Sequence, residues 1–110
     1  MNVVQEYSIE IYQTEAGRQP FIEWLEGLKA VSTSRLVRAR IERIQSGNLG
    51  DHRELGGGLF EFRIFHGPGY RIYFGKEGQR LILLLTGGSK GSQSRNIAKA
   101  RAFLEDYRKR

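Results

Sequence analysis

The order of apolar and polar positions predicts one strand and then two helices in the first half of the chain. Residues 7–12 alternate between apolar and polar side chains, a pattern typical of a half-buried strand. A helix is expected to begin at Pro20, because proline is favoured at the first helical position and apolar residues follow at helical spacing. A second helix is expected over 34–46, with Gly47 as its stop. The residues expected to face the core from these elements are Tyr7, Ile9, Ile11, Phe21, Trp24, Leu25, Leu28, Val37, Ile41 and Ile44.

Short, aromatic-rich strands separated by glycines are predicted in the second half. Two segments, 59–65 and 70–74, flank a His-Gly-Pro-Gly sequence, whose composition is typical of a hairpin turn. The apolar run within 80–86 indicates a central strand covered on both faces, which Gly87 and Gly88 are expected to end. A last helix follows a polar loop, and its expected core-facing residues are Ile97, Ala100, Phe103, Leu104 and Tyr107.

These elements predict an α+β fold with the order strand, two helices, three antiparallel strands and helix. The expected architecture is a mostly antiparallel sheet with the two N-terminal helices packed on one face, together with a C-terminal helix. The other face of the sheet is expected to stay partly free. A length of 110 residues indicates a single domain spanning 1–110.

Strand alternation sorts the side chains of the predicted hairpin onto two faces. Glu61, Arg63, Arg71 and Tyr73 share one face and are expected on an accessible surface, since a slip of one residue would bury both arginines. The sequence leaves open whether Arg63 lies opposite Arg71 or opposite Tyr73. The opposite, apolar face is expected to carry Phe60, Phe62, Ile64, Tyr70, Ile72 and Phe74.

Charge changes this picture, because 18 Lys and Arg against 12 Asp and Glu give a net charge of +6. Such a balance favours an anionic partner: nucleic acid first, an acidic protein second and a membrane surface third. A merely soluble basic domain is the alternative. The chain has no cysteine and two histidines, and it lacks a phosphate-binding loop motif, so neither a metal nor a cofactor is expected.

The location expected from the sequence is the cytoplasm. Residues 1–6 lack the basic and apolar regions of a signal peptide. The longest apolar run, at 81–85, is far too short to span a bilayer. The absence of cysteine agrees with a reducing compartment.

The two hairpin arginines are candidates for a phosphate site. Guanidinium groups bind phosphate oxygens in pairs and stabilise the charge that develops in a transition state. The alternative is a surface pair of Glu61 with Arg63 or Arg71, and a spare arginine, which adds little to stability. Close arginines repel each other unless a carboxylate or an incoming anion separates them.

Further candidates flank the hairpin. His52 and Arg53 are expected in the loop before it, and Lys90 follows the central strand, beside a glycine that permits close approach to an anion. Simple solvation is the alternative for His52, and His66 in the turn is expected to be structural. The helix over 34–46 carries arginines that are expected to face solvent, namely Arg35, Arg38, Arg40 and Arg43.

The chain resembles the HigB-like branch of the RelE/ParE toxins, also described as phage-derived addiction-module killer proteins. The resemblance covers nearly the whole chain and depends on several segments in a fixed order. These are PFIEWL at 20–25, GGLFEFR at 57–63, GYRIYF at 69–74, LLLTGGSK at 83–90, Gln93 and IAKA at 97–100.

The resemblance implies the toxin of a type II toxin–antitoxin system with a RelE-like antiparallel sheet. Many such toxins are mRNA interferases, which cleave mRNA on the ribosome without a metal and so inhibit translation. Their antitoxin is usually a small helix-turn-helix protein. The implied RNA-binding residues are Arg53, Glu61, Arg63, Arg71 and Lys90, and the implied catalytic residues are Arg63, Arg71, Tyr73, Lys90 and His52.

The general base is left unassigned. An unperturbed tyrosine or lysine is protonated at neutral pH, so Tyr73 and Lys90 need strong perturbation to accept a proton. Histidine is better suited by its intrinsic pKa, which favours His52. A late tyrosine serves catalysis in many RelE-type enzymes, but the spacing of Tyr107 with Phe103 favours core packing here.

Two other functions remain as alternatives. A ParE-like DNA gyrase inhibitor is built on the same fold and needs no catalytic residues. An inactive, nucleic-acid-binding relative would use its positive charge for phosphate contact alone.

Overall fold

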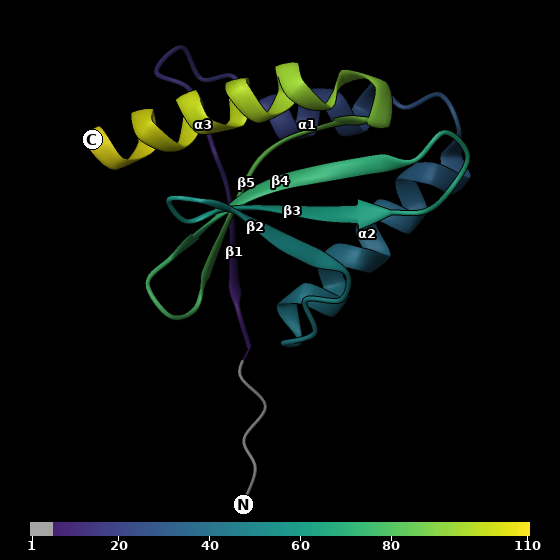
Figure 1. The fold of residues 1–110 in the computed structure, drawn as a ribbon, viewed down its shortest axis with the longest axis horizontal. Helices are drawn as coiled ribbons and strands as arrows, with labels where there is room; N and C mark the ends of the chain where they lie inside the picture. The colour runs from purple at the N-terminus through teal and green to yellow at the C-terminus, as the bar shows by residue number, and fades with distance from the viewer. Residues whose placement is uncertain (1–5) are drawn as a thin grey trace, which may run out of the picture.

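A five-stranded mixed sheet in the order β1-β5-β4-β3-β2 runs through the protein, and three helices complete an α+β fold (Figure 1). The computed structural model describes residues 6–110, so most of the segment used to exclude a signal peptide lies outside the described residues. The elements in chain order are β1 (Ser8–Ile11), α1 (Pro20–Glu26), α2 (Val31–Gln45), β2 (His52–Gly56), β3 (Leu59–Ile64), β4 (Tyr70–Glu77), β5 (Leu81–Ser89), a 3-10 turn (Lys90–Ser92) and α3 (Gln93–Lys109).

Most predicted elements are present, with small shifts of their ends. Pro20 begins α1 as expected, and α2 begins at Val31, three residues before the predicted start. The first strand, β1, pairs in parallel with β5, while the other neighbouring strands are antiparallel. The sheet is therefore mixed but mostly antiparallel, as the sequence indicated.

The strand β2 was missed. The expectation that His52 and Arg53 lie in a loop is wrong, because this segment pairs antiparallel with β3. His52 lies opposite Phe62, and Arg53 lies opposite Glu61. Most side chains of this edge strand are exposed, so the backbone pairing forms without the alternating apolar pattern that would have revealed it.

The expectation that Gly87 and Gly88 end the central strand is also wrong, since β5 continues through both to Ser89. A Cβ atom at Gly87 would clash with the Trp24 ring of α1, and one at Gly88 would clash with Asn96 of α3. The two glycines face opposite sides of the sheet, because successive residues of a strand alternate. They allow one helix to approach the strand closely on each face.

Two apolar cores lie on opposite faces of the sheet. The first joins α1 and α2 to the sheet through Phe21, Leu25, Val37, Ile44, Phe62, Ile64, Ile72, Phe74, Ile82 and Leu84. The second joins α3 to the sheet through Tyr12, Leu59, Tyr73, Leu83, Leu85, Ala100 and Leu104.

The packing of both N-terminal helices on one face was thus predicted correctly, but the other face is less open than expected. The helix α3 covers much of it, and Glu61 and Tyr73 beneath are fully buried. The apolar stripe of α3 has to be covered, and α1 and α2 already occupy the first face. Within residues 6–110, no helix is both long and apolar enough to cross a membrane.

Candidate phosphate-binding site

The pairing of β3 with β4 brings the two candidate arginines together. Arg63 lies directly opposite Arg71, and Glu61 lies opposite Tyr73. All four side chains belong to the face that α3 covers, so the predicted sharing of one face is confirmed. The register that the sequence left open is the one that pairs the arginines.

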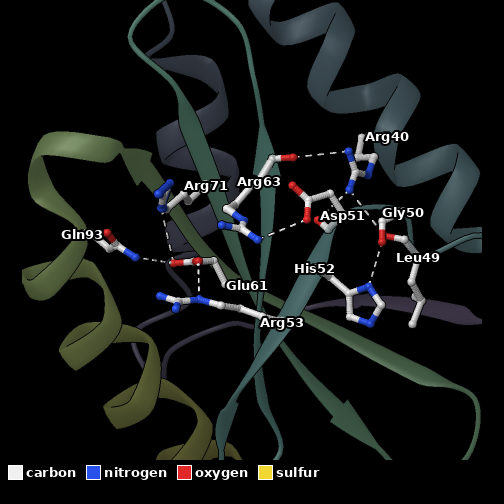
Figure 2. A network of polar contacts seen from close by, with 10 residues as sticks. All are labelled: Arg40, Leu49, Gly50, Asp51, His52, Arg53, Glu61, Arg63, Arg71 and Gln93. Atoms are coloured by element: carbon white, nitrogen blue, oxygen red, sulfur yellow. Dashed lines mark hydrogen bonds and ion pairs between the residues drawn. The ribbon is translucent and has the colours of Figure 1, made fainter.

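A buried carboxylate lies at the centre of this face. Glu61 Oε1 is 3.1 Å from Arg53 Nε of β2, and its Oε2 accepts a 3.0 Å hydrogen bond from Gln93 Nε2 of α3 (Figure 2). Arg71 Nε lies 3.5 Å from the same Oε2. A buried charge is tolerated only when it is paired and hydrogen-bonded, and here two cations and one amide meet that need. The cluster joins three strands and the start of α3.

Arg71 is the more enclosed of the two arginines, with a side chain only 12% exposed. Its Nε is buried and donates no hydrogen bond to any residue within 6–110. Its pairing with Glu61 is thus electrostatic rather than a formed hydrogen bond, because 3.5 Å with poor alignment is too long for one. The guanidinium group is oriented by the carboxylate and keeps donor capacity for an anion.

Arg63 is supported from the edge of the sheet. Its Nη2 lies 3.2 Å from Asp51 Oδ1, just before β2. Arg40 of α2 fixes both segments, donating to the Asp51 carbonyl at 2.8 Å and to the Arg63 carbonyl at 3.3 Å. The expectation of a solvated Arg40 is therefore wrong: it packs over the Phe62 ring, and burial lowers its pKa.

A cleft of about 350 Å³ opens at the tip of the hairpin beside these arginines. Arg63, Arg71 and Lys90 line it from three segments, and no carboxylate is among its lining residues. The Lys90 amide donates a 3.1 Å hydrogen bond to the Gly69 carbonyl, which fixes the lysine backbone against the turn. Three cationic side chains and no carboxylate line this cleft, which makes it a candidate site for an anion.

Tyr73 is near the arginines but does not reach the cleft. Its side chain is fully buried, and its hydroxyl has no hydrogen-bond partner among the residues that the structure describes. Burial first, and then the negative charge of Glu61, raise the pKa of Tyr73. The phenol therefore stays protonated at neutral pH.

The structure separates His52 from the arginines. Because His52 pairs with Phe62, its side chain lies on the opposite face of the sheet, 6.2 Å from Phe60 and 6.1 Å from Phe62 between ring centroids. Its Nδ1 is 2.9 Å from the Gly50 carbonyl, and Figure 2 shows the ring turned away from Glu61. This placement gives His52 no contact with the phosphate site.

Sequence reasoning missed several members of the site. His66, which we expected to be structural, lines the cleft together with Tyr70. The sequence could have indicated both residues by their position, because they lie in or beside the turn between two strands that carry arginines. Asp51 left no signal of its own, and the sequence indicated Gln93 only as part of the family resemblance, because the partner of each residue is distant in sequence. Tyr107, near the end of α3, packs against the second core, as its spacing indicated.

The remaining chemistry of the described residues is simple. Over residues 6–110, no group of three or more His, Cys, Asp and Glu side chains is arranged to hold a metal ion. The functional groups that converge are therefore guanidinium, ammonium, imidazole and phenol. Together with the fold, they define a small basic α+β domain with a cleft lined by cationic side chains.

Comparison with known proteins gives the family. No protein-family model matches the chain. An uncharacterized protein of Haemophilus influenzae is 38% identical over 86 residues, which cover 78% of this chain and 87% of that relative. The chain belongs to the same family as this Haemophilus protein.

Proposed function

We propose that the protein is the toxin of a type II toxin–antitoxin system and acts as a ribosome-dependent, metal-independent mRNA endoribonuclease. The observation that carries this proposal is the convergence of Arg63, Arg71 and Lys90 in a cleft without a carboxylate. RNA is the anionic polymer that such a toxin meets in the cytoplasm, where we expect the protein to act. Inhibition of translation is the expected consequence.

The fold and the sequence both support this proposal. The segments that carry the resemblance to the HigB-like branch of the RelE/ParE toxins include Arg63, Arg71 and Lys90 of the cleft. A mostly antiparallel sheet with two N-terminal helices on one face agrees with the RelE-like architecture that the resemblance implies. A net charge of +6 favours long-range attraction of a polyanion such as the ribosome with its mRNA.

The proposed reaction uses the ribose as nucleophile. The 2′-oxygen attacks the adjacent phosphorus and the bond to the 5′-oxygen breaks, which leaves a cyclic phosphate and a 5′-hydroxyl. Arg63, Arg71 and Lys90 offset the negative charge that builds on the phosphorus oxygens. One proton leaves the 2′-hydroxyl and another reaches the departing 5′-oxygen.

His66 is the proposed proton-transfer residue. It is the histidine that lines the cleft, and it is exposed at the hairpin turn, within reach of a bound polymer. Imidazole is the side-chain type most suited to accepting and returning a proton near neutral pH. Tyr73 and His52, both considered from sequence, serve the fold of the site rather than the reaction in this proposal.

The partner expected for such a toxin is a small helix-turn-helix antitoxin. A protein with this role neutralises the toxin and represses the operon that encodes both. The neighbouring reading frame should therefore encode a small protein with a helix-turn-helix pattern. Co-expression with that protein should relieve growth arrest caused by the toxin.

The decisive experiment maps the 5′ ends of mRNA after brief induction of the protein. Discrete cuts within translated messages, each with a 5′-hydroxyl, support the proposal. The same cuts should appear when purified ribosomes, mRNA and the protein are combined in the presence of a chelator. Intact messages together with trapped gyrase–DNA complexes would instead favour a gyrase inhibitor.

A matched pair of variants links the activity to the cleft. Arg71→Ala removes a lining guanidinium, whereas Arg35→Ala removes an exposed arginine on α2. The first variant should lose the cuts and the second should keep them. Full activity of Arg71→Ala would remove the cleft from the reaction.

A further inference from the structure

An exposed aromatic ring stands at the mouth of the cationic cleft. Phe65 is 81% exposed, the most exposed of the large apolar side chains within 6–110, and it lines the cleft with Arg63 and Lys90. A single exposed apolar residue needs no explanation by itself. Its position beside three cationic groups, however, is the combination by which proteins bind single-stranded nucleic acid.

Tyr70, which lines the cleft, also borders a second hollow. This groove of about 580 Å³ lies between α1 and α3, along the end of β5, and Tyr70 lines both spaces. Trp24 of α1 lines the groove next, and its ring centroid is 6.5 Å from that of Tyr70. Both rings are half-buried, so each keeps part of its surface accessible. The three rings thus line two hollows that share Tyr70 as a wall.

Positive charge accompanies the rings along the groove. Arg95 and Lys99 of α3 are exposed and line it. Glu23, the carboxylate among the lining residues, lies 2.6 Å from Arg18 and so is already neutralised. The groove is therefore cationic in balance, like the cleft on the other side of Tyr70.

We propose that the aromatic track formed by Phe65, Tyr70 and Trp24 binds the bases that flank the cleaved phosphate of a single-stranded RNA. Arg95 and Lys99 contact the phosphates of the same strand. This inference rests on the proposed RNA-directed function, and it adds a substrate requirement: at least one unpaired base on the Tyr70 side of the cleft. Aromatic stacking accepts any base, because each base presents a π face.

Charge alone does not select this occupant, since an acidic peptide would also suit Arg95 and Lys99. The aromatic rings make the difference. Carboxylate side chains gain little from three neighbouring aromatic rings, whereas bases can stack on them. The observations therefore favour RNA, and an acidic peptide is one outcome that the test must separate.

The test uses direct binding rather than cleavage. Trp24 is the only tryptophan of the chain, so its fluorescence reports on the groove. The full-length protein is titrated with a six-nucleotide oligonucleotide whose 2′-hydroxyls are methylated, and with an abasic oligonucleotide of the same phosphate number. The first should quench Trp24 and bind more tightly, while the second should bind weakly without quenching.

A variant pair then isolates the contribution of stacking. Phe65→Ala should weaken binding of the base-containing oligonucleotide about 5- to 100-fold and leave abasic binding unchanged. Val31→Ala, which trims another exposed apolar side chain that lines neither the cleft nor the groove, should change neither. Because Phe65 is exposed, loss of fold does not complicate the result.

The outcomes separate this inference from the proposed function. Equal affinity for the two oligonucleotides, or equal quenching by polyglutamate, overturns the aromatic track even when the protein cleaves mRNA. Base-dependent binding that Phe65→Ala weakens supports the track even when no mRNA is cleaved. In that case the protein binds RNA but the proposed endonuclease reaction fails.

Discussion

Glu61 and Arg71 form an ion pair across β3 and β4, with the carboxylate Oε2 3.5 Å from the guanidinium Nε. The carboxylate is fully buried, and the guanidinium lines the cleft. A buried ion pair is weak evidence for a role in stability alone, because apolar residues of similar size in its place often give a fold that is equally stable or more stable. In the proposed function, the pair holds Arg71 in place for an incoming phosphate.

Replacing Glu61 with Gln should therefore affect both folding and activity. Arg71 and Arg53 would lose their shared counter-charge, and we expect a loss of about 2–4 kcal/mol in the free energy of unfolding. Cleavage should fall as well, since Arg71 would no longer be oriented. Urea denaturation and a cleavage assay measure the two effects. Glu77→Gln, which breaks the surface pair with Arg108, should cost less than about 1 kcal/mol and preserve cleavage.

Arg71→Lys tests whether geometry or charge alone matters in the cleft. Lysine keeps the positive charge but lacks the planar fork that binds two phosphate oxygens. We expect a rate reduction on the order of 10²-fold, close to that of Arg71→Ala, in single-turnover cleavage on ribosomes. Near-complete rescue by lysine would show that the site needs only a point charge, which contradicts the proposed bidentate contact.

His66→Ala should change the pH dependence of cleavage and not only its rate. A histidine that transfers a proton creates a limb in the rate profile between about pH 5 and 8. We expect this limb to disappear in the variant, with binding of a methylated oligonucleotide unchanged. His52→Ala is the matched control, because that ring lies on the other face of the sheet. A profile that keeps its shape without His66 would exclude it from proton transfer.

The candidate site shows where sequence reasoning succeeds. Strand alternation alone assigned Glu61, Arg63, Arg71 and Tyr73 to one face, because a period of two leaves little freedom once the apolar side is known. Alternation also led us to expect an accessible face, which is wrong for Glu61 and Tyr73 because both are buried. Burial of Glu61 depends on α3, whose Gln93 contacts Glu61 and lies 32 residues further along the chain. Strand alternation carries no information on a contact between residues so far apart in sequence.

The missed strand has a related cause. Residues 52–56 are mostly polar, so their pairing with β3 comes from backbone hydrogen bonds and not from an apolar pattern. We expected His52 near the arginines because we had assigned it to a loop, where strand alternation does not fix the direction of a side chain. Once Arg53 is fixed opposite Glu61, alternation forces His52 to the other face.

Gly87→Ala tests the close approach of α1 to the central strand. A methyl group at this position would clash with the Trp24 ring, which is packed beside Phe21 and cannot move away freely. We expect a loss of about 1–3 kcal/mol in the free energy of unfolding, measured in urea. Gly91→Ala is the matched control, because no atom lies within 4 Å of the added carbon there. Equal stability of the two variants would contradict the tight packing of Trp24 on β5.

Tyr12→Phe should reveal a link between stability and alkaline pH. The Tyr12 hydroxyl donates a 2.5 Å hydrogen bond to Asp106 Oδ2, and burial, followed by that bond, raises the pKa of Tyr12 to about 12. An unfolded tyrosine titrates near 10. Because the folded value is higher, the contribution is fully present below pH 10 and is lost as the pH rises through 12.

We therefore expect Tyr12→Phe to be less stable than the natural protein by about 1–3 kcal/mol at pH 7. The difference should shrink steadily between pH 10 and pH 12, because the natural protein then loses the proton that makes the bond. Urea denaturation at pH 7, 10 and 11.5 measures it. A difference that stays constant over this range would show that the ring packing of Tyr12 on Phe103, and not its hydroxyl, anchors the C-terminal helix.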